Sequence, residues 1–165
     1  MDFLEKVKNA GIIGMGGAGF PAYKKLELAK STKSEYHYLI CNSSEGELGL
    51  FKDLHILENH LEDLFKGIKY VLDYLGSDLG FLYINRNYYT KLKEKLEDIV
   101  FKYSEDGYSI TPFIEEPSYI GGDASTILNM MEFGKNQPMF KKDRTAVKGL
   151  FGQPTVIHNV ETLYN

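Results

Sequence analysis

The densest group of residues suited to ligand binding is a glycine cluster near the N-terminus, GMGGAGFP at residues 14–21. Glycine tolerates positive φ and lets a ligand approach the backbone closely. Pro21 is suited to open a helix, because the N–H that it lacks would be unpaired in the first turn. N–H groups ahead of a helix start bind anions such as phosphate, and Lys24 or Lys25 would add a positive charge. The alternative is a glycine-rich connector. A dinucleotide-binding fingerprint requires a strand before the glycines, and ahead of Gly14 there is only the pair Ile12 and Ile13, so we do not expect a standard Rossmann phosphate turn.

Two further groups of polar residues and glycines follow predicted strands. The first is NSSEGELGLFKD at residues 42–53, and the second is YIGGDAS at residues 119–125. Ligands of open parallel sheets bind outside the carboxyl ends of the strands, where such side chains can hydrogen-bond a ring or a ribose. Each group also has a simpler interpretation. The first would be a solvated acidic loop in which Asp53 caps the next helix, and in the second Asp123 would be only a helix cap.

The remaining residues give little sign of metal or nucleophilic chemistry. His55 and His60 are five positions apart, which does not place them on one helix face, and the HExxH pattern is absent. Cys41 is the single cysteine, so this chain can form neither an internal disulfide nor a cysteine-ligated iron–sulfur or zinc site. We therefore expect no metal site in this chain.

The elements that position these groups follow from the spacing of apolar residues. It predicts helices over 3–9, 21–30, 53–75, 88–103 and 123–133, and strands over 36–42, 80–85 and 108–114. Alternating strands and helices are typical of right-handed crossovers and a parallel sheet. We predict a three-layer, Rossmann-like α/β fold in one domain. Its parts are the glycine loop with flanking helices (1–35), an α/β core (36–133) and an irregular C-terminal extension (134–165).

Length and composition bound the class of protein. The chain has 165 residues, of which 43% are apolar and 25% charged, as in an ordinary single globular domain. Nineteen basic and 23 acidic residues give a net charge of −4, and Arg86 and Arg144 are the only arginines. This balance argues against a nucleic-acid partner. No apolar run approaches the ~20 residues that span a bilayer, and the N-terminus does not resemble a signal peptide. We expect a cytoplasmic protein without direct membrane insertion.

Four segments, taken together, are similar to motifs of one known family. They are GGAGFP at 16–21, CNSSEGELGLFKD at 41–53, YIGGDASTILN at 119–129 and GLFGQPTVIHNVETL at 149–163. They resemble GRGGAGFP, CNADESEPGTFKD, YICGEETALLN and GLWGKPTxxNNVETL in the FMN-binding domain of the NADH-oxidising flavoprotein subunit of respiratory complex I. That family also occurs in NAD-linked hydrogenases and formate dehydrogenases. The resemblance extends over nearly the whole chain, in the same order and with similar spacing.

The resemblance implies that FMN lies in the crevice between these loops, with its phosphate near the glycine cluster and a lysine. The implied cofactor-binding residues are Gly14, Gly16, Gly17, Lys25, Asn42, Ser44, Glu45, Tyr119, Gly122, Asp123, His158 and Asn159. NADH would bind near Phe20, Glu47, Lys141 and Arg144. Because the flavin carries the hydride chemistry, no side chain is expected to be catalytic.

The chain also departs from the family pattern at several positions. Ser44 replaces an aspartate, Asp123 and Ala124 replace paired glutamates, His158 replaces an asparagine, and Leu28 and Arg144 replace aromatic residues of the adenine site. The residues that the resemblance implies for FMN binding are therefore partly retained, whereas those that it implies for NADH binding are largely replaced. The family normally continues into a ubiquitin-like domain and a helical bundle that holds a [4Fe–4S] cluster, so this chain is either truncated or a short paralogue.

Three functional hypotheses follow. The first is a flavin module that accepts hydride from NADH and passes electrons to an iron–sulfur partner. The partner would belong to an NADH dehydrogenase-like or hydrogenase-like complex, and the module would be peripheral to a membrane. The second is a module that binds FMN but has lost NADH oxidation. The third is a structural subunit with an empty crevice.

Overall fold

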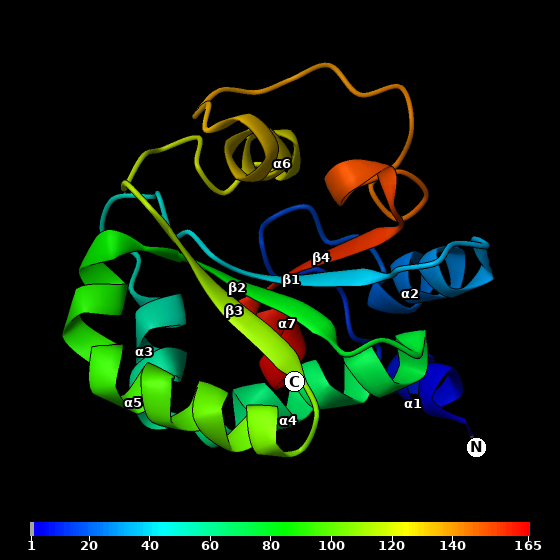
Figure 1. Ribbon diagram of the computed structural model, residues 1–165, viewed down its shortest axis with the longest axis horizontal. Helices are drawn as coiled ribbons and strands as arrows, with labels where there is room; N and C mark the ends of the chain where they lie inside the picture. The colour runs from blue at the N-terminus through cyan, green and yellow to red at the C-terminus, as the bar shows by residue number, and fades with distance from the viewer. Residues whose placement is uncertain (1) are drawn as a thin grey trace.

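The computed structural model describes residues 2–165 and has one parallel four-stranded sheet (Figure 1). The strands are β1 (Tyr38–Ser43), β2 (Leu79–Asn85), β3 (Ser109–Glu115) and β4 (Thr155–Asn159), in the order β3-β2-β1-β4. The chain crosses from β1 to β2 to β3 in one direction, and β4 then pairs with the free edge of β1. The strand order therefore reverses between β1 and β4, which is where α/β sheets bind ligands.

Helices cover both faces of the sheet, so the predicted three-layer α/β fold is confirmed. One face carries α1 (Phe3–Asn9), α2 (Ala22–Ser31), α3 (Lys52–Asn59), α4 (Leu61–Leu75), α5 (Arg86–Glu105) and α7 (Val160–Tyr164). The other carries α6 (Ala124–Phe133) and a short 3-10 turn (Leu150–Gly152). The two sides of the sheet follow from strand alternation. In β1, Leu39 and Cys41 join the larger core, and Ile40 between them joins the smaller one. Among the helices of residues 2–165, none has the length and apolar character needed to cross a membrane.

The sequence signals for helix ends match the structure at several points. Asp2 and Glu5 form a capping box at the start of α1. Gly76 and Gly134 adopt the left-handed conformation directly after α4 and α6. Asp123 accepts hydrogen bonds from two backbone N–H groups at the start of α6 and therefore does act as its N-cap.

The prediction of one continuous helix over residues 53–75 is wrong, because the chain bends at His60. This residue has φ −132° and ψ 28° and lies between α3 and α4. Its ring packs against the ring of Tyr164 in α7, with centroids 5.0 Å apart. α7 contacts both α3 and α4, so the two helices bend around it. A tertiary contact causes the bend, and neither glycine nor proline marks it in the sequence.

The prediction that residues 134–165 are irregular is wrong for residues 155–164, which form β4 and α7. β4 has only five residues, three of them polar, so it lacks an apolar strand pattern of its own. Its conformation comes from pairing with β1 in register from Tyr38↔Thr155 to Asn42↔Asn159. β1 itself begins at Tyr38, two residues later than expected. The segment assigned to a tail therefore completes the sheet.

We predict that Gly67→Ala strongly destabilises the fold. A Cβ atom at Gly67 would lie 1.7 Å from the backbone oxygen of Leu163, so α4 and α7 could no longer pack closely. We expect a loss of about 3 kcal/mol or more in the free energy of unfolding, measured by urea denaturation. Lys66→Ala, on an exposed position of the same helix, is the matched control and should change it by less than ~0.5 kcal/mol. Equal effects of the two substitutions would contradict the docking of α7 on α4.

Candidate functional site

A cavity of about 470 Å³ lies at the carboxyl ends of β1 and β4. This volume is within the range of small-molecule sites. Its walls are residues 15–17 of the glycine cluster, parts of the 42–53 segment after β1, parts of the 119–123 segment before α6, and Asn159 at the end of β4. The three groups of residues that sequence analysis identified separately therefore face one cavity.

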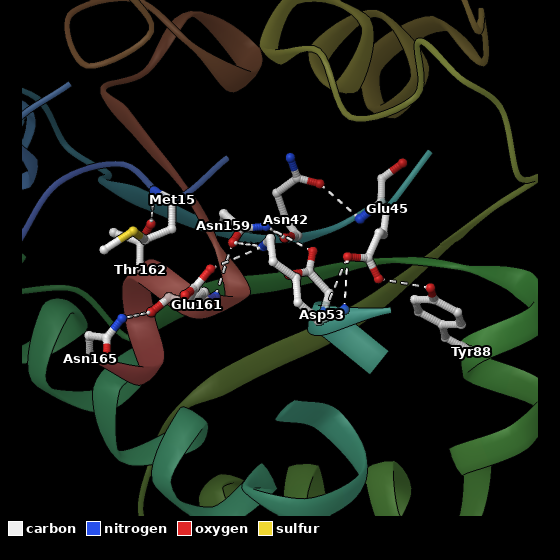
Figure 2. A network of polar contacts seen from close by, with 11 residues as sticks. Met15, Asn42, Glu45, Asp53, Tyr88, Asn159, Glu161, Thr162 and Asn165 are labelled. Atoms are coloured by element: carbon white, nitrogen blue, oxygen red, sulfur yellow. Dashed lines mark hydrogen bonds and ion pairs between the residues drawn. The ribbon is translucent and has the colours of Figure 1, made fainter. Parts of the chain in front are cut away.

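The glycine cluster forms a closed loop that is anchored to α7. Gly14 donates its N–H to the Phe20 oxygen at 2.8 Å, and Ile13 and Pro21 form an isolated antiparallel bridge. The Met15 N–H donates to Thr162 Oγ1 at 2.9 Å (Figure 2). Within residues 2–165, the N–H groups of Gly16 and Gly17 donate to no protein acceptor. Both residues line the cavity, so these two donors remain for a ligand.

Glu45 is largely committed to holding the acidic loop in place. Its Oε1 accepts hydrogen bonds from the backbone N–H groups of Lys52 and Asp53 at the start of α3, at 3.1 and 3.4 Å. Its Oε2 accepts the hydroxyl of Tyr88 in α5 at 2.9 Å, as Figure 2 shows. Burial and the hydrogen bond to Glu45 raise the pKa of the Tyr88 hydroxyl. Glu45 therefore positions the wall of the cavity and caps α3.

Asp53 and Asn159 join the 42–53 segment to the end of β4. The buried Asp53 carboxylate accepts hydrogen bonds from the Lys52 ammonium at 2.6 Å and from the Asn159 amide at 2.8 Å. Asn159 Oδ1 accepts from Lys52 Nζ at 2.8 Å and from the Glu161 N–H at 3.1 Å, which caps α7. Burial raises the pKa of Asp53, and the hydrogen bond and charge of Lys52 oppose this change. These hydrogen bonds fix the orientations of the Asp53 and Asn159 side chains (Figure 2).

Sequence analysis missed Glu115, a buried carboxyl group behind the cavity. It ends β3 with 1% exposure and accepts hydrogen bonds from the Ser44 and Tyr83 hydroxyls, the latter at 2.9 Å. Burial raises the pKa of Glu115, and the two hydrogen bonds partly oppose this. Ser44 lines the cavity at the position where the family motif has an acid, so a carboxyl group from β3 now supports that position. Glu115 directly follows the predicted strand 108–114, and this position at the carboxyl end of a strand is the signal that could have identified Glu115.

Several residues expected at the flavin lie outside this cavity. Lys25 Nζ donates to the Ile157 oxygen at 2.7 Å, and burial lowers its pKa. Gly14 is not in the cavity wall. His158 does not fit its expected role, because strand alternation turns it to the opposite side of the sheet from Asn159. There it lines a small cavity with residues of α1, α2 and α4. Burial lowers its pKa to about 3, so the ring is neutral at pH 7.

The residues expected to bind NADH divide among three places. Glu47 lines the main cavity. Phe20 and Arg144 share a second cavity of about 310 Å³ with Leu28 and Lys25. Lys141 belongs to neither, and its Nζ donates to the Lys148 oxygen at 2.9 Å. In the part of the chain that the structure describes, no three histidine, cysteine or acidic side chains are arranged as a metal site.

Comparison with known proteins identifies the family of this fold. The family model described as the Nuo51 FMN-binding domain matches residues 7–165. The chain belongs to this family. The resemblance seen in the four sequence motifs is thereby confirmed, and FMN is the cofactor by which the family is defined.

Proteins similar to this chain include subunits of NADH-quinone oxidoreductases and of an NAD-reducing hydrogenase. One subunit of the NADH-quinone oxidoreductase of Rhizobium meliloti (strain 1021) is 32% identical over 98% of this chain, which covers 41% of that protein. The NAD-reducing hydrogenase HoxS subunit alpha of Cupriavidus necator is 31% identical over 96% of this chain and 28% of its own length. A solved NAD+-reducing [NiFe]-hydrogenase, air-oxidised, matches 98% of this chain and 28% of that chain, with a TM-score of 0.90 and 33% identity. This chain thus spans only part of each of these relatives, and less than half of the Rhizobium protein.

We predict that Glu115 makes the stability of this FMN-binding domain depend on pH. Because its pKa is raised in the folded state, the folded state binds the proton more tightly than the unfolded chain. The protonated Glu115 side chain stabilises the fold fully at pH values below about 4.3, the ordinary pKa of glutamate in an unfolded chain. This stabilisation is lost as the pH rises through the higher pKa that Glu115 has in the folded state. The free energy of unfolding of the wild type, minus that of Glu115→Gln, should therefore fall as pH rises from 4 to 8.

Urea denaturation at each pH measures this difference, and Asp53 is present in both proteins, so its own titration cancels. Glu116→Gln, at an exposed position beside Arg86, is the control for replacing a carboxyl group by an amide at the surface. A difference that rises with pH would mean that the buried group is stabilised as the ionised carboxylate.

Proposed function

We propose that this chain is the FMN-holding module of an oxidoreductase related to NADH dehydrogenases and NAD-reducing hydrogenases. One observation carries the proposal: two unpaired N–H groups of the glycine cluster and the polar ends of two parallel strands face one cavity. This combination supports a ligand that has a phosphate at one end and a polar ring at the other. Membership of the Nuo51 FMN-binding domain family supports FMN as that ligand.

The chemistry of the cavity fits FMN. The N–H groups of Gly16 and Gly17 suit phosphate oxygens, and Lys25 lies on the first turns of the helix that follows. Ser44, Tyr119 and residues 122–123 line another part of the wall and offer hydroxyl and backbone groups to a ribityl chain and ring. FMN, when bound, supplies two-electron acceptance and one-electron donation. The chain's own residues hold and orient the cofactor.

Tyr119 lies at the rim of the cavity and remains 77% exposed. Gly46 allows the 42–53 segment to pack against it, because a Cβ there would lie 2.8 Å from the Tyr119 oxygen and 2.7 Å from the Ser118 oxygen. This close contact closes the wall between the two loops. Asn42 adds to it, donating its amide N–H to the Gly122 oxygen at 3.0 Å. The loops are thus joined before any ligand enters, so the site is largely pre-formed.

We propose further that electrons leave this module through a partner. The relatives are subunits of larger assemblies, and this chain spans about 41% of the NADH-quinone oxidoreductase relative from Rhizobium. An iron–sulfur centre, in a partner protein or in a longer form of the chain, would accept the electrons one at a time. The module would then lie at the cytoplasmic side, peripheral to a membrane complex.

A second candidate is a module that retains FMN but no longer oxidises NADH. Ala124 and Leu28 favour it, because neither supplies the carboxylate or the aromatic ring of the family pattern. Aromatic stacking contributes ~0.5–1.5 kcal/mol per pair beyond burial. The two candidates differ in NADH affinity, whereas both predict a yellow protein.

We predict that FMN binds the purified chain and that Lys25→Ala weakens binding about tenfold or more. Lys25 Nζ donates to the Ile157 oxygen at 2.7 Å and would turn to the phosphate when FMN binds. A charge-assisted hydrogen bond to phosphate contributes ~1.5–3 kcal/mol. Quenching of FMN fluorescence during titration measures the dissociation constant. Lys30→Ala, on the exposed side of the same helix, is the matched control and should leave it unchanged. Unchanged affinity in Lys25→Ala would reject the role of Lys25, and absence of FMN binding to the wild type would reject the proposed function.

We predict that NADH binds weakly to the flavin-loaded chain. Two aromatic contacts, at positions 28 and 144, and one carboxylate, at position 124, are missing relative to the family pattern. Together they reduce the binding free energy of NADH by roughly a few kcal/mol, which corresponds to a factor of ~100 or more in the dissociation constant. Anaerobic titration with NADH, followed by bleaching of the flavin absorbance, measures this affinity. The double variant Leu28→Phe/Arg144→Phe should improve it. Rapid bleaching of the wild type at micromolar NADH would contradict the prediction and favour the full enzyme.

A further inference from the structure

The second cavity differs sharply from the first in its charge. It is lined by Phe20, Lys24, Lys25, Leu28, Arg144, Thr145 and Ala146, a set with three cationic side chains and no carboxylate. The main cavity, in contrast, is lined by Glu45, Glu47, Asp53 and Asp123, with Lys52 as its one basic residue. The glycine cluster separates the two, since Gly16 and Gly17 line the first and Phe20, at the end of the cluster, lines the second.

The three cations are not neutralised by the protein. Across the described residues 2–165, none of Lys24, Lys25 and Arg144 forms an ion pair with a carboxylate. Lys25 is half-buried, and its Nζ has a neutral carbonyl, that of Ile157, as its partner. Arg86, the other arginine of the chain, pairs with Glu116. An unpaired arginine beside two lysines in a cavity is a site for an anion, and guanidinium groups bind phosphate in a bidentate manner.

The same cavity offers a surface for a planar ring. Phe20 is 39% exposed, and Leu28 and Ala146 add apolar contacts beside it. A ring with an attached phosphate therefore fits both halves of the cavity. An adenine with a phosphate on its ribose is such a group, and an arginine near the ribose is how dinucleotide sites accept a 2′-phosphate.

From these observations we propose that the second cavity selects a dinucleotide that carries a 2′-phosphate over one that lacks it, with Arg144 as the specificity-determining residue. The inference rests on the proposed function, because it names the dinucleotide that would meet the flavin. It changes the expected electron donor from NADH to its 2′-phosphorylated counterpart. Weak binding of NADH is then a consequence of specificity, since Lys24 and Arg144 would face a ribose hydroxyl in place of a phosphate.

The test compares 2′,5′-ADP with 5′-AMP, which differ only in the 2′-phosphate, by isothermal titration calorimetry on the flavin-free chain. We expect 2′,5′-ADP to bind ~10-fold or more tightly at low salt, since one charge-assisted contact accounts for this ratio. The ratio should decrease as salt screens the charges. Arg144→Phe, which restores the aromatic residue of the family pattern, should abolish the preference, and Arg144→Lys should keep part of it. Arg86→Phe is the matched control and should leave the ratio unchanged.

Equal affinity for the two nucleotides, or a preference that survives Arg144→Phe, would overturn the inference. A parallel titration of the same protein with FMN keeps the two proposals separate. FMN binding without a 2′-phosphate preference rejects only the inference. A preference that depends on Arg144 in a chain that does not bind FMN rejects the proposed function and leaves a nucleotide site.

Discussion

The buried carboxylate of Asp53 is the contact on which the arrangement of the site depends. It receives a hydrogen bond from Asn159, and Asn159 in turn caps α7 through the Glu161 N–H. α7 then holds the glycine cluster through the bond between Thr162 and Met15. These contacts join the loop after β1, the end of β4 and the N-terminal loop in one sequence of hydrogen bonds (Figure 2). Loss of the carboxylate would leave the Asn159 amide without its shortest acceptor and release the cap.

The two cavities differ in the charge of the side chains that line them. Carboxylates around the main cavity are mostly engaged in holding loops, as Glu45 and Asp53 show. The donors that face this cavity without a protein acceptor, within residues 2–165, include the backbone N–H groups of Gly16 and Gly17. The cations of the second cavity form no ion pair with any carboxylate of residues 2–165, and the exposed ring of Phe20 lies in the same cavity. A flavin and a nucleotide would thus be held by different kinds of interaction on the two sides of one glycine loop. The fold of the FMN-binding family is retained here.

Sequence analysis predicted the three-layer fold and the groups of residues that line the main cavity. It succeeded where the signal is local: apolar periodicity in α5, glycine caps after α4 and α6, and polar residues after buried strands. It failed where the structure depends on distant contacts. The bend at His60 comes from packing against Tyr164, and β4 obtains its conformation from β1. His158 and Asn159 were assigned the same role, although strand alternation turns neighbouring residues to opposite faces.

The position of β4 also has a consequence for the order in which the protein is made. β1 lies in the interior of the sheet, but its second neighbour is synthesised more than one hundred residues later, and the Met15–Thr162 bond joins positions 147 apart. Contacts of such long range form late, because their loops must close first. The cavity therefore cannot exist on the nascent chain until residues 155–162 have left the ribosome. Cofactor capture must follow the completion of the sheet, and a cofactor that binds only the folded chain would draw the last docking step to completion.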